Sequence, residues 1–392
     1  MELEKKAVSK KQTVFIDARL IFYAGVGRYL RELIYNICEI DKDISFYLLG
    51  DKKKLAEFIE SDKSDVLSME RFTLLDSRAK KYSFGEQFVL QYLFIKYSKR
   101  VDLFFCPHFN VPLFYLPKNS VVTVHDLTFF KFSSYFGNIK TFIAKILLKR
   151  TLKNAQKIIT DSNFVKKDII AMFGINENLV KILEDKIEVV YPGLGKSFAP
   201  VTEDEVLRFK TEKKLGQYIL YCGNRKKHKN IVNMIKAFDV AKKDLPDIKL
   251  VIIGLRFKEH DFADKYIEEN NIRDIVQLKN VPDDELRLYY GAAEAFAFFS
   301  LSEGFGFAPL EAASCGTPLI LSSAAALPEV FAGAAIFTDP CDIMDMADAI
   351  KRVVSDKTLK KELKVKSLEL AGKYSYTDTA VKTIKVFMQV TR

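Results

Sequence analysis

Short apolar runs alternate with longer amphipathic stretches along almost the whole chain, and this alternation restricts the fold more than any other feature of the sequence. A helical pattern at residues 27–40 and others like it separate the apolar runs of the first half, which lie at residues 14–16, 46–49, 101–106, 121–125, 157–161 and 189–190. Strands that are apolar along their length and separated by helices are typical of a parallel sheet covered on both faces. The first half is therefore expected to be a doubly wound α/β domain.

The same alternation begins again in the second half. Expected strands lie at residues 218–222, 250–253, 275–278, 295–299 and 319–321, and expected helices at residues 230–243, 259–270, 283–292 and 342–354. Between the two series, residues 191–200 contain two prolines and two glycines that interrupt both periodicities, which predicts a linker between domains.

The length of 392 residues fits two domains. We expect an N-terminal domain at 1–195, a C-terminal domain at 196–375, and a final helix at 376–392 that packs back on the first domain. Doubly wound sheets bind ligands beyond the carboxyl ends of their strands. The sequence therefore predicts two Rossmann-like, doubly wound parallel-sheet domains that face each other across a cleft.

Charge and composition restrict the function. The formal net charge is +10, and +8 of it falls on residues 1–195, which contain 31 Lys and Arg against 23 Asp and Glu. This asymmetry fits an acidic partner such as anionic lipid, a phosphorylated substrate or nucleic acid, and it equally fits a lysine-rich solvated surface. No aromatic-basic RNA motif or helix-turn-helix spacing supports nucleic acid.

Cysteine usage and hydropathy favour a cytoplasmic protein without a structural metal. The five cysteines are widely spaced without Cys-x-x-Cys, and the four histidines lack metal-ligand spacing. Residues 1–11 are polar and charged rather than a signal sequence, and no run of about 20 apolar residues occurs. We therefore expect a cytoplasmic protein with no disulfides, no zinc and no membrane span.

Two segments have the composition of phosphate-binding turns. Gly25 and Gly27 lie between an expected strand and an expected helix, where exposed N–H groups and the helix dipole favour an anion; a purely structural turn explains the same pattern. Residues 223–230, GNRKKHKN, follow the strand at 218–222 with four cations and a histidine. Such a loop can compensate a diphosphate, or it can be a solvated basic loop.

A third segment carries two carboxylates in apolar surroundings. Glu303 and Glu311 are the only charged residues between residues 295 and 328. Pro309 suits the first turn of a helix, so the helix is expected to begin near Phe307. The two carboxylates would then flank one helix N-terminus, where they could accept hydrogen bonds from vicinal hydroxyls or simply compensate the helix dipole.

These residues resemble a known family. Glu303 and Glu311 match the E-x7-E signature of retaining GT-B glycosyltransferases of family four, and the surrounding SEGFGFAPLEAASCGTPLILSSAAALPEV resembles the family's most characteristic segment. The resemblance continues, in the family's order, through FIDARLIFYAGVGRYLREL, VTVHDLTFF, NVPDDELRLYYGAA and YSYTDTA. It spans essentially the whole chain, and the subgroup is similar to mannosyltransferases of bacterial surface-polysaccharide assembly.

The resemblance implies a role for each matching residue. His125 would contact the transferred sugar, Glu303 would hold sugar hydroxyls, and Arg225 with Lys229 would hold the diphosphate. His228 stands where the family commonly has arginine, so Arg225 could supply that guanidinium. The remaining implied donor-binding residues are Gly25 and Gly27 at the phosphates or acceptor, Glu311 at the ribose, Val281 and Pro282 near the base, and Gly223, Asn224, His228, Gly304, Phe305, Gly306 and Phe307 beside sugar and phosphate.

The reaction implied by the resemblance is the transfer of a hexose, with retention, to a hydroxyl of a lipid-linked oligosaccharide in O-antigen, capsule or exopolysaccharide synthesis. GDP-mannose is the expected donor and mannose the expected transferred sugar; a UDP-sugar is the alternative donor. No cofactor or metal is expected, because no Asp-x-Asp lies on a plausible metal-binding loop. A nucleotide-sugar 2-epimerase shares the architecture, but it would lack the E-x7-E block followed by Leu-Pro-Glu at 327–329.

Residues 141–157 suggest a membrane partner. This segment, TFIAKILLKRTLKNAQK, mixes aliphatic residues with Lys and Arg. It could lie on an anionic membrane on the inner face of the plasma membrane, where a lipid-linked acceptor would be found. The alternative is an amphipathic core helix with a basic outer face.

Overall fold

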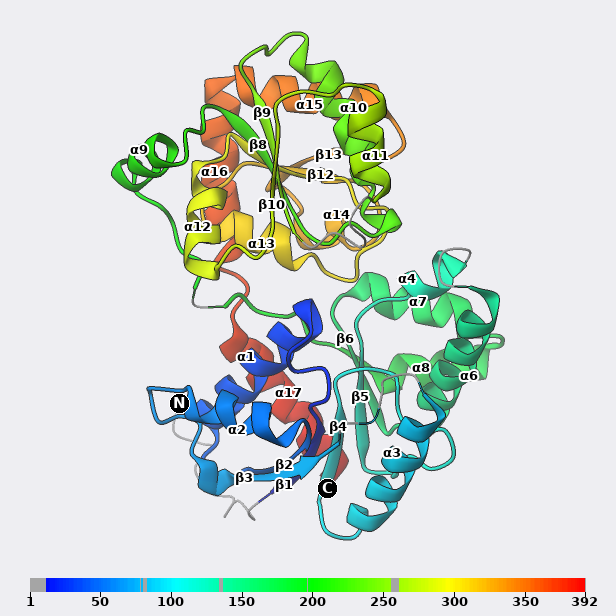
Figure 1. Ribbon diagram of the computed structural model, residues 1–392. Helices are drawn as coiled ribbons and strands as arrows, with labels where there is room; N and C mark the ends of the chain where they lie inside the picture. Colours follow the sequence, from blue (N-terminus) through cyan, green and yellow to red (C-terminus); the bar gives the residue numbers. More distant parts are fainter. Residues whose placement is uncertain are drawn as a thin grey trace. The chain divides into compact units, whose positions relative to one another are not determined.

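The computed structural model describes residues 12–77, 79, 83–133, 137–195, 197–254 and 261–391. Contacts divide the chain into two compact units (Figure 1). Unit 1 contains Met1–Gly193 together with Tyr376–Arg392, and unit 2 contains Leu194–Ser375. The last helix, α17 (Tyr376–Thr391), therefore belongs to unit 1 although it follows unit 2 in the sequence.

Unit 1 is built on a seven-stranded parallel sheet. Its strand order is β3-β2-β1-β4-β5-β6-β7, with every neighbouring pair parallel. The strands are β1 (Thr13–Asp17), β2 (Ser45–Gly50), β3 (Phe72–Asp76), β4 (Leu103–Cys106), β5 (Ser120–Val124), β6 (Lys157–Thr160) and β7 (Ile187–Val189).

Helices cover both faces of this sheet because successive strand residues point to opposite sides. Phe15 packs its ring 5.3 Å from Phe94 of α3 on one face, and Phe105 packs 5.3 Å from Phe387 of α17 on the other. The first face carries α3 (Phe84–Tyr97), α6 (Asn138–Asn154), α7 (Asn163–Phe173) and α8 (Glu177–Lys186), and the second carries α1 (Ala24–Ile40), α2 (Lys52–Glu60) and α17.

Unit 2 repeats this architecture with six strands. The order β10-β9-β8-β11-β12-β13 is again parallel throughout. The strands are β8 (Tyr218–Cys222), β9 (Lys249–Ile253), β10 (Ile275–Leu278), β11 (Ala295–Phe298), β12 (Leu319–Ser322) and β13 (Ala335–Thr338).

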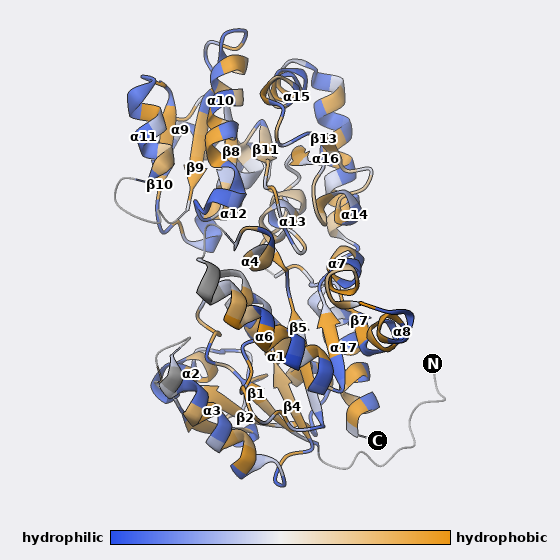
Figure 2. Cartoon of the chain, turned by 90° about the vertical axis from the view of Figure 1, so that its right-hand side faces the viewer, coloured by the Kyte–Doolittle hydropathy of each residue, from blue (hydrophilic) through white to orange (hydrophobic). Residues whose placement is uncertain are grey.

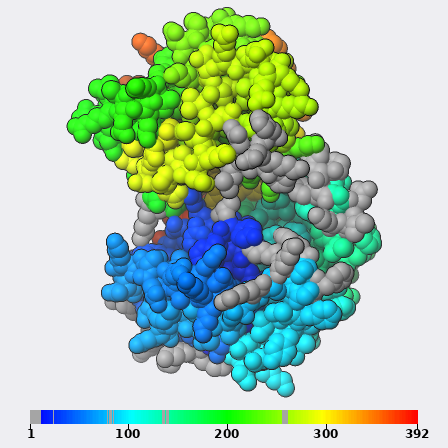
Figure 3. All heavy atoms as spheres, in the orientation of Figure 1, coloured from blue at the N-terminus to red at the C-terminus, as the bar shows by residue number. Residues whose placement is uncertain are grey.

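The helices of unit 2 also form two layers. One layer contains α10 (Ile231–Lys242), α11 (Phe262–Glu269) and α15 (Ile343–Ser355); the other contains α12 (Asp283–Ala292), α13 (Phe307–Ser314) and α16 (Lys357–Ala371). At the edge of the second layer, α9 (Glu203–Glu212) packs on α12 and stands out on the surface in green (Figure 3). Two further helices are short: α14 (Leu327–Val330) in unit 2 and α4 (Thr128–Lys131) in unit 1.

The hydropathy pattern matches this layering. Strands of both units are largely orange in Figure 2, whereas most helices show both colours. Most strand residues of both sheets are fully buried, as expected for strands covered on two faces. The structure thus confirms the predicted fold class of two doubly wound parallel-sheet domains.

Candidate functional site

The order of the strands in unit 2 places a ligand site between two particular loops. From β8 the chain continues to β9 and β10 on one side, whereas β11 leads to β12 and β13 on the other. Crevices form where the strand order reverses in this way, outside the carboxyl ends of the two central strands. The loops after β8 and β11, residues 223–230 and 299–306, flank this position.

Two predicted site residues meet there. Lys229 comes from the loop after β8 and Glu303 from the loop after β11, and Lys229 Nζ lies 2.5 Å from Glu303 Oε1. Both side chains are partly accessible, with relative exposures of 14% and 13%. Lys229 Nζ also lies 5.2 Å from the centre of the Phe298 ring, at the end of β11. The sheet topology thus brings together two residues that are 74 positions apart.

Hydrogen bonds fix the two loops to one another. The backbone N–H of Leu301 and the hydroxyl of Ser300 both donate to the carbonyl oxygen of His228, at 2.8 and 3.1 Å. Asn230, with φ of 60°, donates from its side chain to the Pro340 carbonyl at 2.7 Å. The predicted site residue His228 is therefore buried, and it contributes its backbone to the loop contact rather than an exposed ring.

The helix α13 begins at Phe307, as the sequence predicted. Gly306 precedes it with φ of 114°, and a methyl group there would lie 2.9 Å from a Leu327 methyl carbon. Only glycine fits this turn easily. Glu303 lies on the loop before the helix, and Glu311 lies within it, where its Oε2 accepts a hydrogen bond from the Tyr290 hydroxyl at 3.0 Å.

The neighbours of Glu303 on this segment are mostly enclosed. Gly304 and Phe305 are buried and Phe307 is half-buried. The Phe305 ring lies 5.5 Å from the rings of Phe307 and of Tyr374. The side chains of this segment therefore anchor the helix start, and Glu303 and the backbone remain as the groups that a ligand could contact.

Arg225, the other expected diphosphate ligand, is buried and paired within unit 2. Its side chain is only 1% exposed. Nη1 donates to Asp264 Oδ1 at 2.9 Å and Nη2 donates to Gln277 Oε1 at 2.6 Å; Asp261 Oδ1 is 3.6 Å from Nη1. A buried charge is stable only when it is paired. Asp264 and Asp261 provide this pairing at Nη1, whereas Nε is buried without a hydrogen-bond partner among the described residues. In this arrangement both terminal nitrogens of Arg225 donate within unit 2, and a contact of Arg225 or Lys229 with a diphosphate stays a prediction.

The other predicted donor-binding residues of unit 2 follow the strands β8 and β10. Gly223, at the end of β8, has φ of 154°, and the next residue, Asn224, is exposed. Val281 lines a cavity of about 370 Å³ between β10, α12 and the segment before β8. Pro282 caps the start of α12 and does not line this cavity.

In unit 1, the ring of His125 is held between two acceptors. It follows β5, and its Nδ1 lies 2.7 Å from Asp161 Oδ2 while its Nε2 lies 2.9 Å from the Pro107 carbonyl oxygen. Both nitrogens can donate only when the imidazole carries two protons. Burial opposes that charge, but Asp161 outweighs it and raises the pKa of His125 above the ordinary 6.5. Both ring nitrogens are therefore used within unit 1, and a contact of His125 with the transferred sugar stays a prediction.

Gly27 is needed for packing inside unit 1. A methyl group at Gly27 would lie 2.4 Å from the carbonyl oxygen of Ile21 and 2.9 Å from that of Leu20. The glycine thus lets α1 begin directly against the preceding turn. Gly25, two residues earlier, is exposed.

Sequence reasoning missed the partners of these residues. Asp161, Asp264 and Gln277 were not singled out, although each follows or lies in an expected strand or helix. A further buried cluster also escaped it: Arg19 donates to both carboxylate oxygens of Asp17, at 2.7 and 2.6 Å, and to Glu86 of α3. Its position after β1 is the signal that could have revealed it, because β1 and β4 form the switch point of unit 1.

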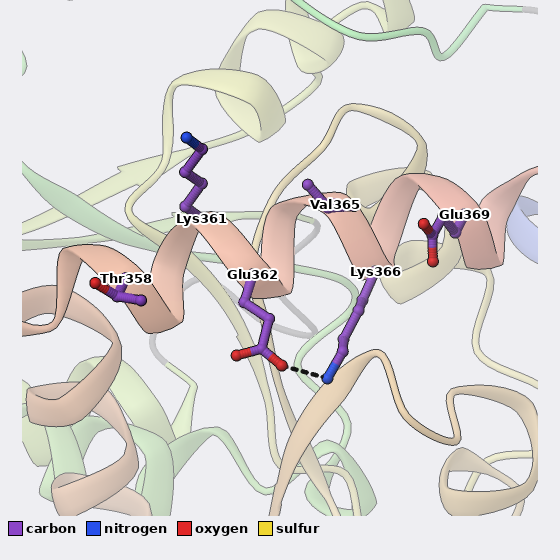
Figure 4. Close-up of a pocket in the computed structure, with 6 residues that line it drawn as sticks. All are labelled: Thr358, Lys361, Glu362, Val365, Lys366 and Glu369. Atoms are coloured by element: carbon purple, nitrogen blue, oxygen red, sulfur yellow. Dashed lines mark hydrogen bonds and ion pairs between the residues drawn. The ribbon is translucent and has the colours of Figure 1, made fainter.

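A second surface hollow is not built from side chains of several elements. Figure 4 shows that its six lining side chains all come from α16, with Glu362 paired to Lys366 at 2.5 Å. A hollow along a single exposed helix brings no groups together from other elements. We therefore assign no site to it.

Within the described part of the chain, no group of three or more His, Cys, Asp or Glu side chains is arranged to hold a metal ion. The same residues include no helix that is long and apolar enough to cross a bilayer.

Comparison with known protein families gives two matches that together cover most of the chain. The family model described as "Glycosyltransferase Family 4" matches residues 23–195, and the one described as "Glycosyl transferases group 1" matches residues 203–369. The two matches fall on the two halves that carry the Gly25–Gly27 and Glu303–Glu311 motifs.

Curated relatives support the same subgroup. "O-antigen chain mannosyltransferase B" of Escherichia coli is 27% identical over 286 residues, which are 71% of this chain and 73% of that protein. "O-antigen chain mannosyltransferase RfbU" of Salmonella typhimurium is 29% identical over 248 residues, 63% of each chain. The match thus spans less than two thirds of the second relative.

Solved structures share the fold at low sequence identity. Sucrose-phosphate synthase from Thermosynechococcus elongatus superposes with a TM-score of 0.74 at 16% identity, covering 97% of this chain and 99% of the other. Anabaena HepE, solved in complex with UDP and glucose, gives 0.74 at 14% identity, covering 97% and 100%.

Proposed function

Because this chain belongs to glycosyltransferase family 4 and has the GT-B fold, we propose that it transfers mannose from GDP-mannose, with retention at the anomeric carbon. The acceptor is a hydroxyl of a lipid-linked oligosaccharide in O-antigen or related surface-polysaccharide synthesis. The names of the curated relatives support mannose as the transferred sugar and the O-antigen as the product. The family supports a nucleotide-sugar donor and a glycan acceptor.

The Lys229–Glu303 pair is the observation that carries this proposal. It joins the two loops at the switch point of unit 2 and is partly open to solvent. One cation and one carboxylate at this position match two adjoining parts of a sugar nucleotide, the anionic diphosphate and the neutral hydroxyls of the sugar. On donor binding Lys229 exchanges Glu303 for a phosphate, and Glu303 accepts hydrogen bonds from the sugar instead.

In the proposed reaction the acceptor oxygen forms a bond to the anomeric carbon as the bond from that carbon to the diphosphate breaks. The proton of the acceptor hydroxyl passes to the leaving diphosphate on the same face, so that the configuration is retained. Lys229 stabilises the charge that develops on the leaving group, and Glu303 fixes the sugar's orientation. We assign no metal ion to this reaction.

We further propose that unit 1 rests on an anionic membrane where the lipid-linked acceptor lies. The outer face of α3 exposes Phe88, Tyr92 and Ile95 by 71%, 61% and 55%, and this spacing puts them on one stripe. Phe114 is 71% exposed, and Gln91 of α3 accepts its backbone N–H at 3.1 Å. The cyan α3 lies at the surface in Figure 3.

The helix α6 also exposes apolar side chains. Arg150 donates to the Phe114 carbonyl at 3.4 Å, and the helix exposes Phe142 by 65% and Ile143 by 48%. Lys145 and Lys149 on the same helix are also exposed. Aromatic and aliphatic side chains flanked by cations suit the interface of an anionic bilayer.

Co-sedimentation with vesicles tests this surface. The protein should pellet at low salt with vesicles that contain about one third anionic lipid, and the double variant Phe88→Ser/Tyr92→Ser should pellet several-fold less. Phe22→Ser, another exposed aromatic of unit 1 at 45% exposure, serves as the matched control. Equal pelleting of all three proteins would remove the membrane role of this face.

Donor binding and transfer test the reaction itself. GDP should raise the melting temperature of the full-length protein more than UDP or ADP does. Labelled mannose from GDP-mannose should pass to a lipid-linked acceptor in the presence of EDTA, with the α-anomeric configuration of the donor retained in the product's NMR spectrum. A larger shift with UDP would favour the alternative UDP-sugar donor. Loss of transfer with EDTA that a divalent cation restores would contradict the metal-free reaction.

A further inference from the structure

We propose that Arg225 is a positioning residue, which sets the loop carrying Lys229 through a buried bridge to α11 and β10. This inference rests on the proposed function of Lys229. It replaces the direct phosphate contact that the sequence suggested for Arg225.

The bridge has a defined geometry. The two terminal nitrogens of Arg225 donate to two different elements: Nη1 to Asp264 Oδ1 on α11 at 2.9 Å, and Nη2 to Gln277 Oε1 on β10 at 2.6 Å. Asp261, which caps the N-terminus of α11, adds a second carboxylate 3.6 Å from Nη1. A planar fork that donates in two fixed directions is specific to arginine, since lysine offers one ammonium group.

Burial separates this role from phosphate binding. The Arg225 side chain is 1% exposed, and the Asp264 side chain is 5% exposed. A move of the guanidinium toward a ligand would break its ion pair with the buried Asp264 carboxylate, which is unfavourable. The charge of Arg225 is thus used inside the unit, and Lys229 is the cation of this loop that reaches Glu303.

The bridge acts at the middle of the loop. The loop's first residue is held by the bond from the Gly223 N–H to the Ile253 carbonyl at 2.9 Å, and its last by the bond from Asn230 to Pro340 at 2.7 Å. Arg225 adds an attachment between these ends, four residues before Lys229. Loss of this attachment lets the loop shift, and a displacement of about 1 Å at a catalytic group can cost a large part of the rate.

Two variants test the bridge from its two ends. Arg225→Lys keeps a charge beside Asp264 but cannot span both partners, and Gln277→Leu removes one partner without leaving a charge unpaired. Each should lower kcat/KM by about tenfold, with little change in melting temperature. Arg287→Lys is the matched control, because Arg287 also pairs with a carboxylate of unit 2, that of Glu205 of α9, but lies at the surface; it should keep wild-type kcat/KM.

Combination with Lys229→Ala separates positioning from general destabilisation. If Arg225 acts through Lys229, the double variant Arg225→Lys/Lys229→Ala should be no slower than Lys229→Ala alone, and Gln277→Leu should behave in the same way. Additive losses would overturn the inference. Wild-type activity in Gln277→Leu together with a loss in Arg225→Lys would also overturn it, because that pattern indicates direct phosphate contact.

Hydrogen exchange of the nucleotide-free protein gives a readout that does not depend on the proposed reaction. Residues 223–230 should exchange faster in Arg225→Lys and in Gln277→Leu than in Arg287→Lys, whereas the strands of unit 2 should be unchanged. Unchanged exchange in this loop would refute the positioning role. Failure of the wild-type protein to bind any nucleotide would instead refute the proposed function and leave this comparison intact.

Discussion

Charged residues at the candidate site are arranged in close pairs, and the pairing decides what each can do. Lys229 and Glu303 form a pair that is partly open, so a ligand can replace either partner. The pair of Arg225 and Asp264 is closed to solvent and serves the loop. His125 and Asp161 form a third pair, in unit 1, with both nitrogens of the ring in use. Burial thus distinguishes residues that residue type and spacing alone had grouped together.

Removal of either member of the open pair should abolish most of the activity. Lys229→Ala removes the cation that stabilises the leaving diphosphate, and Glu303→Ala removes the acceptor for sugar hydroxyls. Each should lower kcat/KM at least about tenfold while the melting temperature changes little. The control Lys226→Ala removes an exposed lysine from the same loop and should leave kcat/KM near that of wild type. Near-normal turnover in Lys229→Ala would exclude its proposed role.

The pKa values of two histidines of unit 1 should be shifted in opposite directions. Asp161 and the Pro107 carbonyl raise the pKa of His125 above 6.5 despite its burial, whereas burial and the neighbouring His125 charge lower the pKa of His108 to about 4. Ring resonances of isotopically labelled histidine, assigned with a His125→Asn variant, should show both shifts. The charged His125 stabilises the fold below pH 6.5, and this contribution should disappear as the pH rises through its folded-state pKa. A pKa of His125 below 6.5 would contradict the geometry in which both ring nitrogens donate hydrogen bonds.

Strands that are buried on both sides could be predicted from the sequence, whereas only two of the four edge strands, β7 and β10, could. All five strands expected in the second half are present, because apolar residues run through them. The two that were missed in the chain as a whole are β3 and β13, each at an edge of its sheet and only partly buried. An edge strand is covered less, so its sequence needs fewer apolar residues and gives a weaker signal.

The candidate site could also be predicted only in part from the sequence. The loops that carry Lys229 and Glu303 could be found, because glycines, cations and isolated carboxylates are visible in the sequence. Burial of Arg225 could not be inferred, since its partners Asp264 and Gln277 are 39 and 52 residues away. Such distant pairs are set by the sheet order β10-β9-β8, which apolar periodicity does not reveal.

The start of α1 should tolerate no side chain at Gly27. Gly27→Ala places a methyl group 2.4 Å from the Ile21 carbonyl oxygen, so the turn or the helix must shift, and the melting temperature of unit 1 should fall by several degrees. Gly85→Ala, in the first turn of α3, is the matched control, because its nearest non-neighbouring atom is 3.8 Å away. It should be neutral or slightly stabilising. Equal melting temperatures for the two variants would contradict the packing role of Gly27.

At the scale of the molecule, the chain makes two units, of which unit 1 is discontinuous in sequence and unit 2 is one continuous segment. The last helix, α17, contacts α1, β4 and β5 of unit 1, and Thr379 donates to the Tyr191 carbonyl at 2.9 Å. Unit 1 is therefore completed only after unit 2 has been synthesised. The stability of unit 1 depends on residues encoded at the far end of the chain.

Truncation of one side chain in α17 should weaken unit 1 selectively. Phe387 is fully buried against Phe105, so Phe387→Ala should lower the stability of unit 1 by about 3–5 kcal/mol. Hydrogen exchange should rise in β1, β4 and β5, while the strands of unit 2 keep their protection. Val365→Ala, at an exposed site on α16 of unit 2, should change neither the stability of unit 1 nor the hydrogen exchange of its strands. Uniform loss of protection across both units would contradict this assignment of α17.

The structure of the protein crystallised with GDP-mannose tests the central claim most directly. The account predicts that phosphate oxygens lie within hydrogen-bond distance of Lys229 Nζ, that Glu303 turns to the sugar hydroxyls, and that Arg225 keeps its bonds to Asp264 and Gln277. A bound nucleotide away from the loops at 223–230 and 299–306, with the Lys229–Glu303 pair still closed, would contradict it.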